Sequence, residues 1–130
     1  MNRNAGVAVA DFTPTVVSGH KIKKGDGNLS LELTRTVDIA LELGKQKRNE
    51  QVIVGFALET ENERSNAEKK LVAKNFDFIV LNSMNDPGAG FGGDTNKVEI
   101  ISRTNGVKKF PLKSKRDVAA DIIDSILEHE

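Results

Sequence analysis

The sequence predicts an α/β fold, a three-layer, Rossmann-like and mostly parallel sheet with an antiparallel hairpin at one edge. Short apolar runs alternate along the chain with stretches whose apolar residues recur at the helical period. The runs at residues 51–58 and 76–81 are apolar except for Gln51 and Asp77, as is typical of parallel strands covered on both faces. Both observations favour one layered domain with helices on both faces of the sheet.

Composition excludes several classes of protein. With 130 residues, 38% of them apolar and 29% charged, the chain is long enough for one packed core. The formal net charge is zero, which argues against nucleic-acid or anionic membrane partners. The sequence has no cysteine and two histidines, so disulfides, thiolate chemistry and His-rich metal sites are excluded. Without a signal peptide or an apolar run long enough to span a bilayer, we expect a cytoplasmic protein.

The N-terminal residues divide into a leader and the start of the domain. Residues 1–6 show no pattern and are predicted to be a disordered leader, followed by a single α/β domain over residues 7–130. Residues 7–10 resemble the last part of a buried strand, which Asp11, Phe12 and Pro14 terminate. Because this strand lies so close to the N-terminus, we expect the sheet to be incomplete there.

The next elements are a turn, a strand and a helix. Residues 25–28 carry a strong turn signal, and residues 29–33 alternate strictly, which predicts a strand with one solvated face. Thr36 and Asp38 suit the start of a helix that ends near Gly44. Its predicted apolar face consists of Val37, Ile39, Ala40 and Leu43.

A polar helix is expected between the two buried strands. Thr60 and Glu63 fit a capping box that opens this helix, which continues to about Lys74. Ala67 and Leu71 are predicted to face the core, and Asn75 to cap the helix at its C-terminus. The strand at 76–81 then ends at Asn82, and a long glycine-rich loop follows over residues 83–96, of a length typical of functional loops.

The C-terminal part predicts a hairpin and a helix. Residues 98–101 and 107–110 form the hairpin around Asn105 and Gly106. Ser114 is the predicted N-cap of the last helix. The apolar stripe of that helix follows the helical period: Val118, Ala119, Ile122, Ile123, Ile126 and Leu127.

Polar and aromatic residues gather where the predicted strands end, which is where open α/β sheets bind ligands. The residues at these three ends are Asp11 with Phe12, Phe56 with Glu59 and Thr60, and Asn82. A basic run, residues 21–24, follows the first end, and glycines follow the run. It is either a solvated surface or a flap that neutralises a triphosphate.

The residues alone leave two possible roles for several of these candidates. Asp11 is either a turn residue or a ligand of Mg²⁺ or of a ribose. Phe12 and Phe56 are either core residues or stacking platforms. Lys70 and Lys74 share one helix face, and their spacing by itself favours a role in solubility. The loop's glycines do not form a dinucleotide-binding fingerprint, because they do not link a strand to a helix.

Several blocks, taken in order, resemble phosphopantothenoylcysteine synthetase, in most bacteria the C-terminal half of a bifunctional coenzyme A biosynthesis protein. The resemblance covers the chain from Val7 to the last helix. The blocks are residues 8–14, 21–24, 37–40, 55–60, 67–75 with Asp77, and 90–96.

This resemblance implies a ligase that joins 4′-phosphopantothenate and cysteine at the expense of CTP, with Mg²⁺ and an acyl-cytidylate intermediate. It implies that Lys21 carries the activity, that Lys23 and Lys24 support phosphate binding, and that the enzyme is a homodimer. It leaves the metal ligands unknown. The implied nucleotide-binding residues also include Ala10, Asp11, Phe12, Asp38, Ile39, Phe56, Lys70 and Lys74.

The sequence departs from the family pattern at its start. The family's Gly-Gly-Thr turn and its Arg/Asn/Ser-rich segment are not found in these residues. We therefore expect this chain to carry the nucleotide and lysine half of the ligase and to be inactive alone. The alternative is a non-catalytic nucleotide-binding or dimerisation module. A nucleic-acid-binding domain is disfavoured by the zero net charge.

Overall fold

A computed structural model describes residues 10–23, 25–59, 61–83, 93–104 and 106–128. It divides the chain into two compact units, residues 1–38 and 39–130, a division that the sequence does not suggest. The predicted leader at residues 1–6 and most of the strand at 7–10 lie outside the described residues. The two units are taken in turn below.

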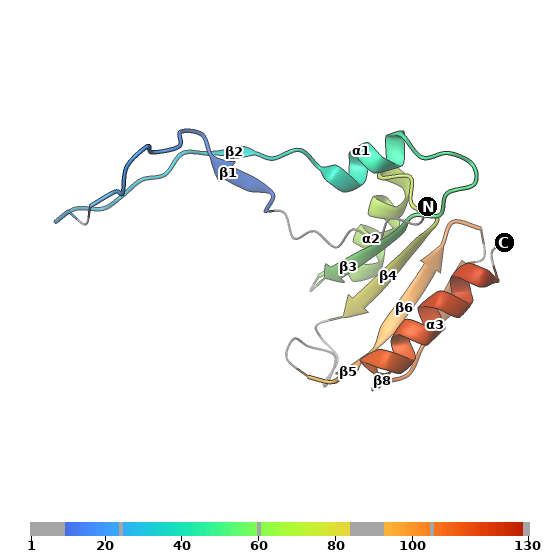
Figure 1. The fold of residues 1–130 in the computed structure, drawn as a ribbon. Coiled ribbons are helices and arrows are strands. Elements are labelled where there is room, and N and C mark those ends of the chain that lie inside the picture. Colours follow the sequence, from blue (N-terminus) through green and yellow to red (C-terminus); the bar gives the residue numbers. More distant parts are fainter. Residues whose placement is uncertain (1–9, 24, 60, 84–92, 105, 129–130) are drawn as a thin grey trace. The chain divides into compact units, whose positions relative to one another are not determined.

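A mixed four-stranded sheet forms the centre of the larger unit (Figure 1). Its spatial order is β3 (Val54–Glu59), β4 (Phe78–Ser83), β6 (Val98–Ser102) and β7 (Gly106–Lys109). β3 and β4 are parallel, with Val54 opposite Phe78, whereas β4–β6 and β6–β7 are antiparallel. The α/β class and the edge hairpin are therefore confirmed. The sheet is mixed rather than mostly parallel, because the chain returns from β4 to β6 at the same edge, with Val98 opposite Asn82.

Helices cover both faces of this sheet (Figure 1). The first helices are α1 (Ile39–Lys45) and α2 (Glu63–Ala73), and α3 (Lys115–Leu127) is the last. On one face, α2 contributes Ala67 and Leu71 to a core cluster with strand residues from β3, β4 and β6. On the other face, α3 contributes Val118 to a second cluster. The buried strand residues of these clusters are Ala57, Ile79, Leu81 and Ile101 in the first and Phe78, Val80, Val98 and Ile100 in the second.

The predicted ends of α2 are only partly correct. Its N-cap is Asn62, which has a left-handed φ of 46° and makes no capping hydrogen bond with its side chain. The predicted Thr60–Glu63 capping box is therefore wrong about the position of the N-cap. Thr60 itself lies outside the described residues. The C-cap is Lys74, and Asn75 follows it with a φ of 55°, the left-handed conformation that asparagine tolerates after a helix.

The last helix begins as predicted. Ser114 Oγ accepts a hydrogen bond from the backbone N–H of Asp117 at 3.1 Å. A two-stranded ladder that the sequence does not predict precedes this cap, formed by β5 (Thr95–Asn96) and β8 (Lys113–Ser114). The expected apolar stripe is wider than the surface that α3 buries, because Ile123 and Leu127 remain exposed.

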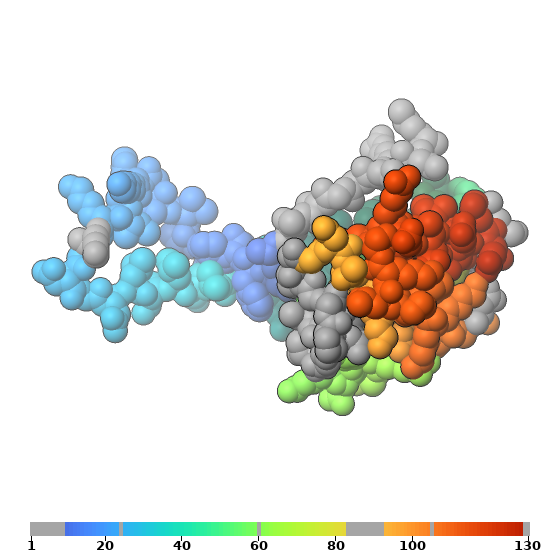
Figure 2. All heavy atoms as spheres, turned by 90° about the horizontal axis from the view of Figure 1, so that it is seen from below, coloured from blue at the N-terminus to red at the C-terminus, as the bar shows by residue number. Residues whose placement is uncertain are grey.

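The smaller unit is a two-stranded ribbon. β1 (Phe12–Pro14) pairs antiparallel with β2 (Leu33–Arg35), and Thr15 N–H donates to the carbonyl of Glu32 at 2.9 Å. Its described residues are exposed apart from Thr36, and Figure 2 shows them as a thin ribbon with no packed interior. The predicted strand at 29–33 is therefore wrong in its bounds, since alternation alone does not fix a strand that has no core to cover.

The first helix also buries less than its pattern predicts. α1 begins at Ile39, close to the predicted start, and ends at Lys45. Of its predicted apolar face, Ala40 packs against the first core cluster, whereas Val37, Ile39 and Leu43 are exposed. Gly44 is buried against the end of α2, and a Cβ built there would lie 1.9 Å from the carbonyl oxygen of Lys74.

One carboxylate joins several segments at the amino end of the sheet. Asp77 Oδ1 accepts from Lys47 Nζ at 2.7 Å, and Asp77 Oδ2 accepts from the backbone N–H of Ile53 at 2.8 Å. The Asp77 N–H donates to the Ile53 carbonyl at 2.9 Å, and Arg103 N–H donates to the Asp77 carbonyl at 3.1 Å. The side chains of Lys47 and Asp77 are 13% and 17% exposed, so their ion pair is largely shielded from water.

We expect Asp77→Ala to lower the free energy of unfolding by about 3 kcal/mol, because it leaves the Lys47 ammonium and the Ile53 N–H in a mostly dry site. Chemical denaturation of both chains measures this difference. Glu50→Ala is the matched control, because it breaks the Arg48–Glu50 pair, whose side chains are 71% and 70% exposed. A loss for Asp77→Ala as small as that of the control would contradict a clamping role.

Candidate functional site

The two parallel strands end side by side, and their last residues face opposite sides of the sheet. Leu58 lies opposite Asn82, and Glu59 lies opposite Ser83. Ala57 packs on the α2 side and Val54 on the α3 side. Because side chains alternate along a strand, Glu59 faces the α2 side, whereas Phe56 and Leu58 face the α3 side.

Phe56 lies on the surface of the sheet rather than in its core. Its side chain is 74% exposed, and Leu58 beside it is 38% exposed. The cluster under α3 draws most of its buried residues from β4 and β6, which leaves this part of β3 uncovered. Of the two interpretations left open by the sequence, the core role is wrong for Phe56. Phe12, which is 51% exposed, is not a core residue either.

The predicted cation Lys70 is held at the end of β3. Its Nζ donates to Glu59 Oε1 at 2.5 Å, and the two side chains are 45% and 14% exposed. Lys74 lies one turn further along α2 as its C-cap, and its N–H donates to the Lys70 carbonyl at 3.0 Å. Their shared face is therefore confirmed, and Lys70 is oriented by a carboxylate rather than simply solvated.

The ribbon brings a second group of predicted residues together. Thr36 N–H donates to the Asp11 carbonyl at 3.0 Å, and Thr36 Oγ1 donates to the Ala10 carbonyl at 2.6 Å. These bonds place Ala10 and Asp11 beside the segment that leads to Asp38. The carboxylate of Asp11 makes neither of these bonds, because the backbone carbonyls accept them.

The basic run lies in the long loop between β1 and β2. Lys21 and Lys23 are exposed there, and Lys24 lies outside the described residues. Asp38 is the last residue of the smaller unit, and Ile39, 44% exposed, is the first residue of the larger one. The predicted convergence of the ribbon residues with Phe56, Lys70 and Lys74 joins residues of different units and stays a prediction.

The donor set suits Mg²⁺ only as a partner of phosphates. Among the described residues, no group of three or more histidines, aspartates or glutamates is placed to hold a metal ion. Mg²⁺ is commonly held by one or two carboxylates together with the phosphates of a substrate. Asp11 is a candidate for this limited role.

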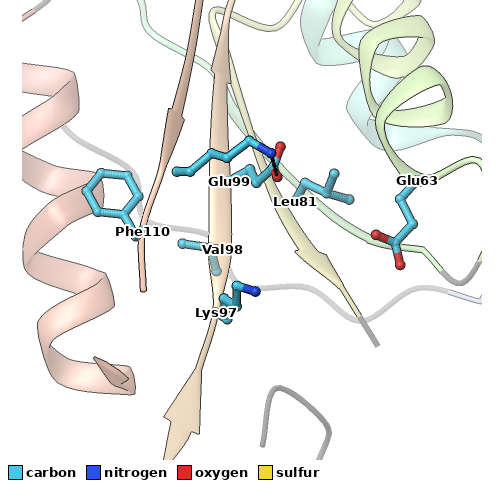
Figure 3. A pocket seen from close by; sticks show the side chains of 7 residues that line it. Glu63, Leu81, Lys97, Val98, Glu99 and Phe110 are labelled. Atoms are coloured by element: carbon cyan, nitrogen blue, oxygen red, sulfur yellow. Dashed lines mark ion pairs between the residues drawn. The ribbon is translucent and has the colours of Figure 1, made fainter. Parts of the chain in front are cut away.

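A small cavity that sequence analysis missed lies at the carboxyl end of β4 (Figure 3). Its volume is about 140 Å³, and its wall includes the ion pair between Lys109 Nζ and Glu99 Oε1 at 2.9 Å. Figure 3 shows Glu63 on the α2 side and Lys97 on the β6 side. Small-molecule sites commonly enclose about 300–1,000 Å³, so this cavity is too small to hold a nucleotide by itself.

Asn82 differs from the other polar residues of this edge. Its Oδ1 is buried and has no hydrogen-bond partner among the residues that the structure describes. The sequence places Asn82 at a strand end, but an unpaired acceptor can be recognised only when the packing around it is known. Buried side-chain oxygens without a partner are few in folded proteins.

Comparison with known proteins identifies the family. Residues 5–129 match the family described as DNA/pantothenate metabolism flavoprotein C-terminal domain. The chain belongs to this family. The resemblance found in the sequence is therefore confirmed at the level of the C-terminal part of a coenzyme A biosynthesis protein.

Curated relatives of this flavoprotein family support the same assignment. The chain is 52% identical over 119 residues to the Coenzyme A biosynthesis bifunctional protein CoaBC of Bacillus subtilis, covering 92% of this chain and 29% of that protein. It is 58% identical over 120 residues to a protein of an unknown prokaryotic organism named Cysteine/Cysteine sulfinic acid decarboxylase, covering 92% of this chain and 33% of that protein. The chain thus spans about a third of these relatives.

Solved structures of the family show the same fold. The C-terminal domain of a CoaBC protein aligns with a TM-score of 0.69 and 35% identity, covering 95% of this chain and 53% of that one. The DNA/pantothenate metabolism flavoprotein of Streptococcus pneumoniae aligns with a TM-score of 0.70 at 19% identity, covering 95% of this chain and 61% of that one, which supports the fold alone.

We expect Lys70→Ala to lower the free energy of unfolding by about 1 kcal/mol, because Lys70 is 45% exposed, so its pair adds little, although the 14% exposed Glu59 carboxylate loses a partner. Chemical denaturation tests this, with Lys69→Ala on the neighbouring exposed position of α2 as the control. A loss close to that of Asp77→Ala would contradict this view and make the Lys70–Glu59 pair structural.

Proposed function

We propose that this chain is the nucleotide-binding and lysine-bearing half of a phosphopantothenate–cysteine ligase in coenzyme A biosynthesis. The observation that carries the proposal is the arrangement at the end of β3. There, the Phe56 ring, 74% exposed, lies on the α3 side of the strand, and Glu59 on the α2 side orients Lys70 of α2 toward the same carboxyl edge. Membership of a family whose relatives are named for coenzyme A biosynthesis supports the pathway.

The proposed reaction has two steps. The carboxylate of 4′-phosphopantothenate attacks the α-phosphorus of CTP, which forms an acyl-cytidylate and releases pyrophosphate. The amine of cysteine then attacks the acyl carbon, forms the amide and releases CMP. Both steps depend on substrate alignment and on neutralising the charge of the phosphates, so the protein supplies position and charge rather than a covalent intermediate of its own.

The residues of this chain have separate roles in that scheme. Lys21 and Lys23 neutralise the triphosphate, and Lys24 shares this role in the proposal. Lys70 and Lys74 extend the positive charge along α2. Mg²⁺, when bound with the phosphates, would add further charge neutralisation. The nucleoside site is lined by four apolar residues, Ala10, Phe12, Ile39 and Phe56. Asp11 and Asp38 are its two acidic residues.

The proposal extends to the setting of the enzyme. Among the described residues, no helix is long and apolar enough to cross a membrane. We propose a cytoplasmic homodimer whose missing substrate-binding residues come from the part of its relatives that this chain does not span. The alternative is a module that binds nucleotide or a second copy without catalysis.

The first test is a calorimetric titration of the chain with Mg·CTP, with Mg·ATP as the competing nucleotide. We expect preference for CTP, and a loss of about tenfold in affinity for Lys21→Ala, the amount expected when one charge-assisted contact is removed. Lys115→Ala, an exposed lysine at the start of α3, is the control and should bind as the unmodified chain does.

The outcomes separate the hypotheses. No binding of either nucleotide would contradict the proposed nucleotide-binding half. Binding without ligase activity, even after the remaining part of the domain is added, would favour the non-catalytic module.

We further expect Lys70→Ala to weaken Mg·CTP binding by about tenfold while Lys69→Ala leaves it unchanged. The reason is geometric, because Glu59 holds Lys70 beside the end of β3. Competition between labelled and unlabelled nucleotide measures both variants in one assay. Equal losses for the two lysines would indicate a general charge effect and contradict a specific contact.

A further inference from the structure

The Oδ1 atom of Asn82 is a buried hydrogen-bond acceptor without a described partner. Leaving such an acceptor unsatisfied costs free energy, whereas an apolar residue of the same size would avoid that cost. The position is otherwise built for apolar packing. On the same face of β4, Phe78 and Val80 are buried in the cluster under α3.

The neighbours of Asn82 account for its lack of a partner. Asn82 lies opposite Leu58 on β3 and opposite Val98 on β6, so apolar side chains flank it on both sides. The peptide groups of β4 pair in the sheet ladder with β3 on one side and with β6 on the other. A donor for Oδ1 must therefore come from beyond the carboxyl edge of the sheet, where ligands of such sheets bind.

Phe56 lies close to this acceptor on the same face. Phe56 is opposite Val80 and Leu58 is opposite Asn82, which makes Phe56 and Asn82 diagonal neighbours on adjacent strands. An aromatic surface that can stack on a planar ring thus adjoins a buried acceptor. A nucleoside fits both features, because its base is a planar ring that stacks on aromatic side chains and its base or ribose carries hydrogen-bond donors.

We propose that Asn82 is a binding residue of the nucleotide site, with Oδ1 accepting a hydrogen bond from the nucleoside. This inference rests on the function proposed above and extends it to specificity. The donor is either the exocyclic amino group of the base or a hydroxyl of the ribose, since both present a hydrogen to an acceptor. An amide acceptor favours cytosine over uracil in the first case and ribose over deoxyribose in the second.

The test is the Asn82→Leu variant, which keeps the size of the side chain and removes its amide. Calorimetry compares its affinity for Mg·CTP, Mg·UTP and the magnesium complexes of 2′-deoxy- and 3′-deoxy-CTP with that of the unmodified chain. We expect the affinity for CTP to fall about tenfold. Preference over UTP or over one deoxynucleotide should be lost, and the analogue that ceases to be discriminated identifies the donor.

Thermal unfolding of the free chain supplies the second readout. A ligand-binding acceptor stabilises nothing in the free chain, so Asn82→Leu should leave Tm unchanged or raise it. Ser125→Ala is the control, because Ser125 is a buried polar residue of α3 whose hydroxyl has a partner: it donates to the Asp121 carbonyl at 2.8 Å. It should leave nucleotide selectivity unchanged. Asn82→Ala serves the same comparison if the leucine variant does not fold.

Each remaining outcome overturns a defined claim. If the unmodified chain binds no nucleotide, the proposed function fails and the role of Asn82 fails with it. If the chain binds CTP and Asn82→Leu retains both affinity and selectivity, the role of Asn82 alone fails. A fall in Tm with unchanged selectivity would make Asn82 a structural residue and would likewise overturn the inference.

Discussion

The Asp77 carboxylate is the constraint on which the geometry of the larger unit depends. It accepts hydrogen bonds from Lys47 and from the N–H of Ile53, the residue just before β3, while its own backbone pairs with Ile53 and Arg103. Arg103 in turn donates to Asn75 Oδ1 at 2.9 Å and to the Leu71 carbonyl at 3.2 Å, which links the end of α2 to the β6–β7 turn. These bonds fix β3 against β4 at their amino ends. The alignment of Glu59 and Asn82 at the other ends follows from that register.

The sequence predicted much of the larger unit because its signals are local. Apolar spacing indicated α2 and α3, the Asn105–Gly106 turn signal predicted the β6–β7 hairpin, and Ser114 was correctly predicted as a cap. It did not predict the direction of β6 relative to β4, since that depends on where a long loop returns the chain. The predicted bounds of the strand at residues 29–33 and the predicted burial of Val37, Ile39 and Leu43 were also wrong, because these apolar residues have no core to cover.

For the candidate site, the sequence predicted which residues take part but not their partners. The strand ends and the basic residues are visible in the sequence, and the family blocks add the assignment of Lys70. What the residues alone could not give are the partners of each group. The Glu59–Lys70 pair, the exposure of Phe56 and the unpaired oxygen of Asn82 arise from three-dimensional packing, which brings together residues distant in sequence.

The position of β3 in the sheet has a consequence for how copies of the chain behave together. Among the described strands, β3 pairs on one side only, with β4. Within the described ranges, no strand pairs with its other side, which leaves backbone donors and acceptors of β3 without a ladder partner next to the exposed side chains of Phe56 and Leu58. Open strand edges with apolar neighbours are templates for strand addition between molecules. As concentration rises, this edge is the surface from which ordered aggregation of the chain would begin.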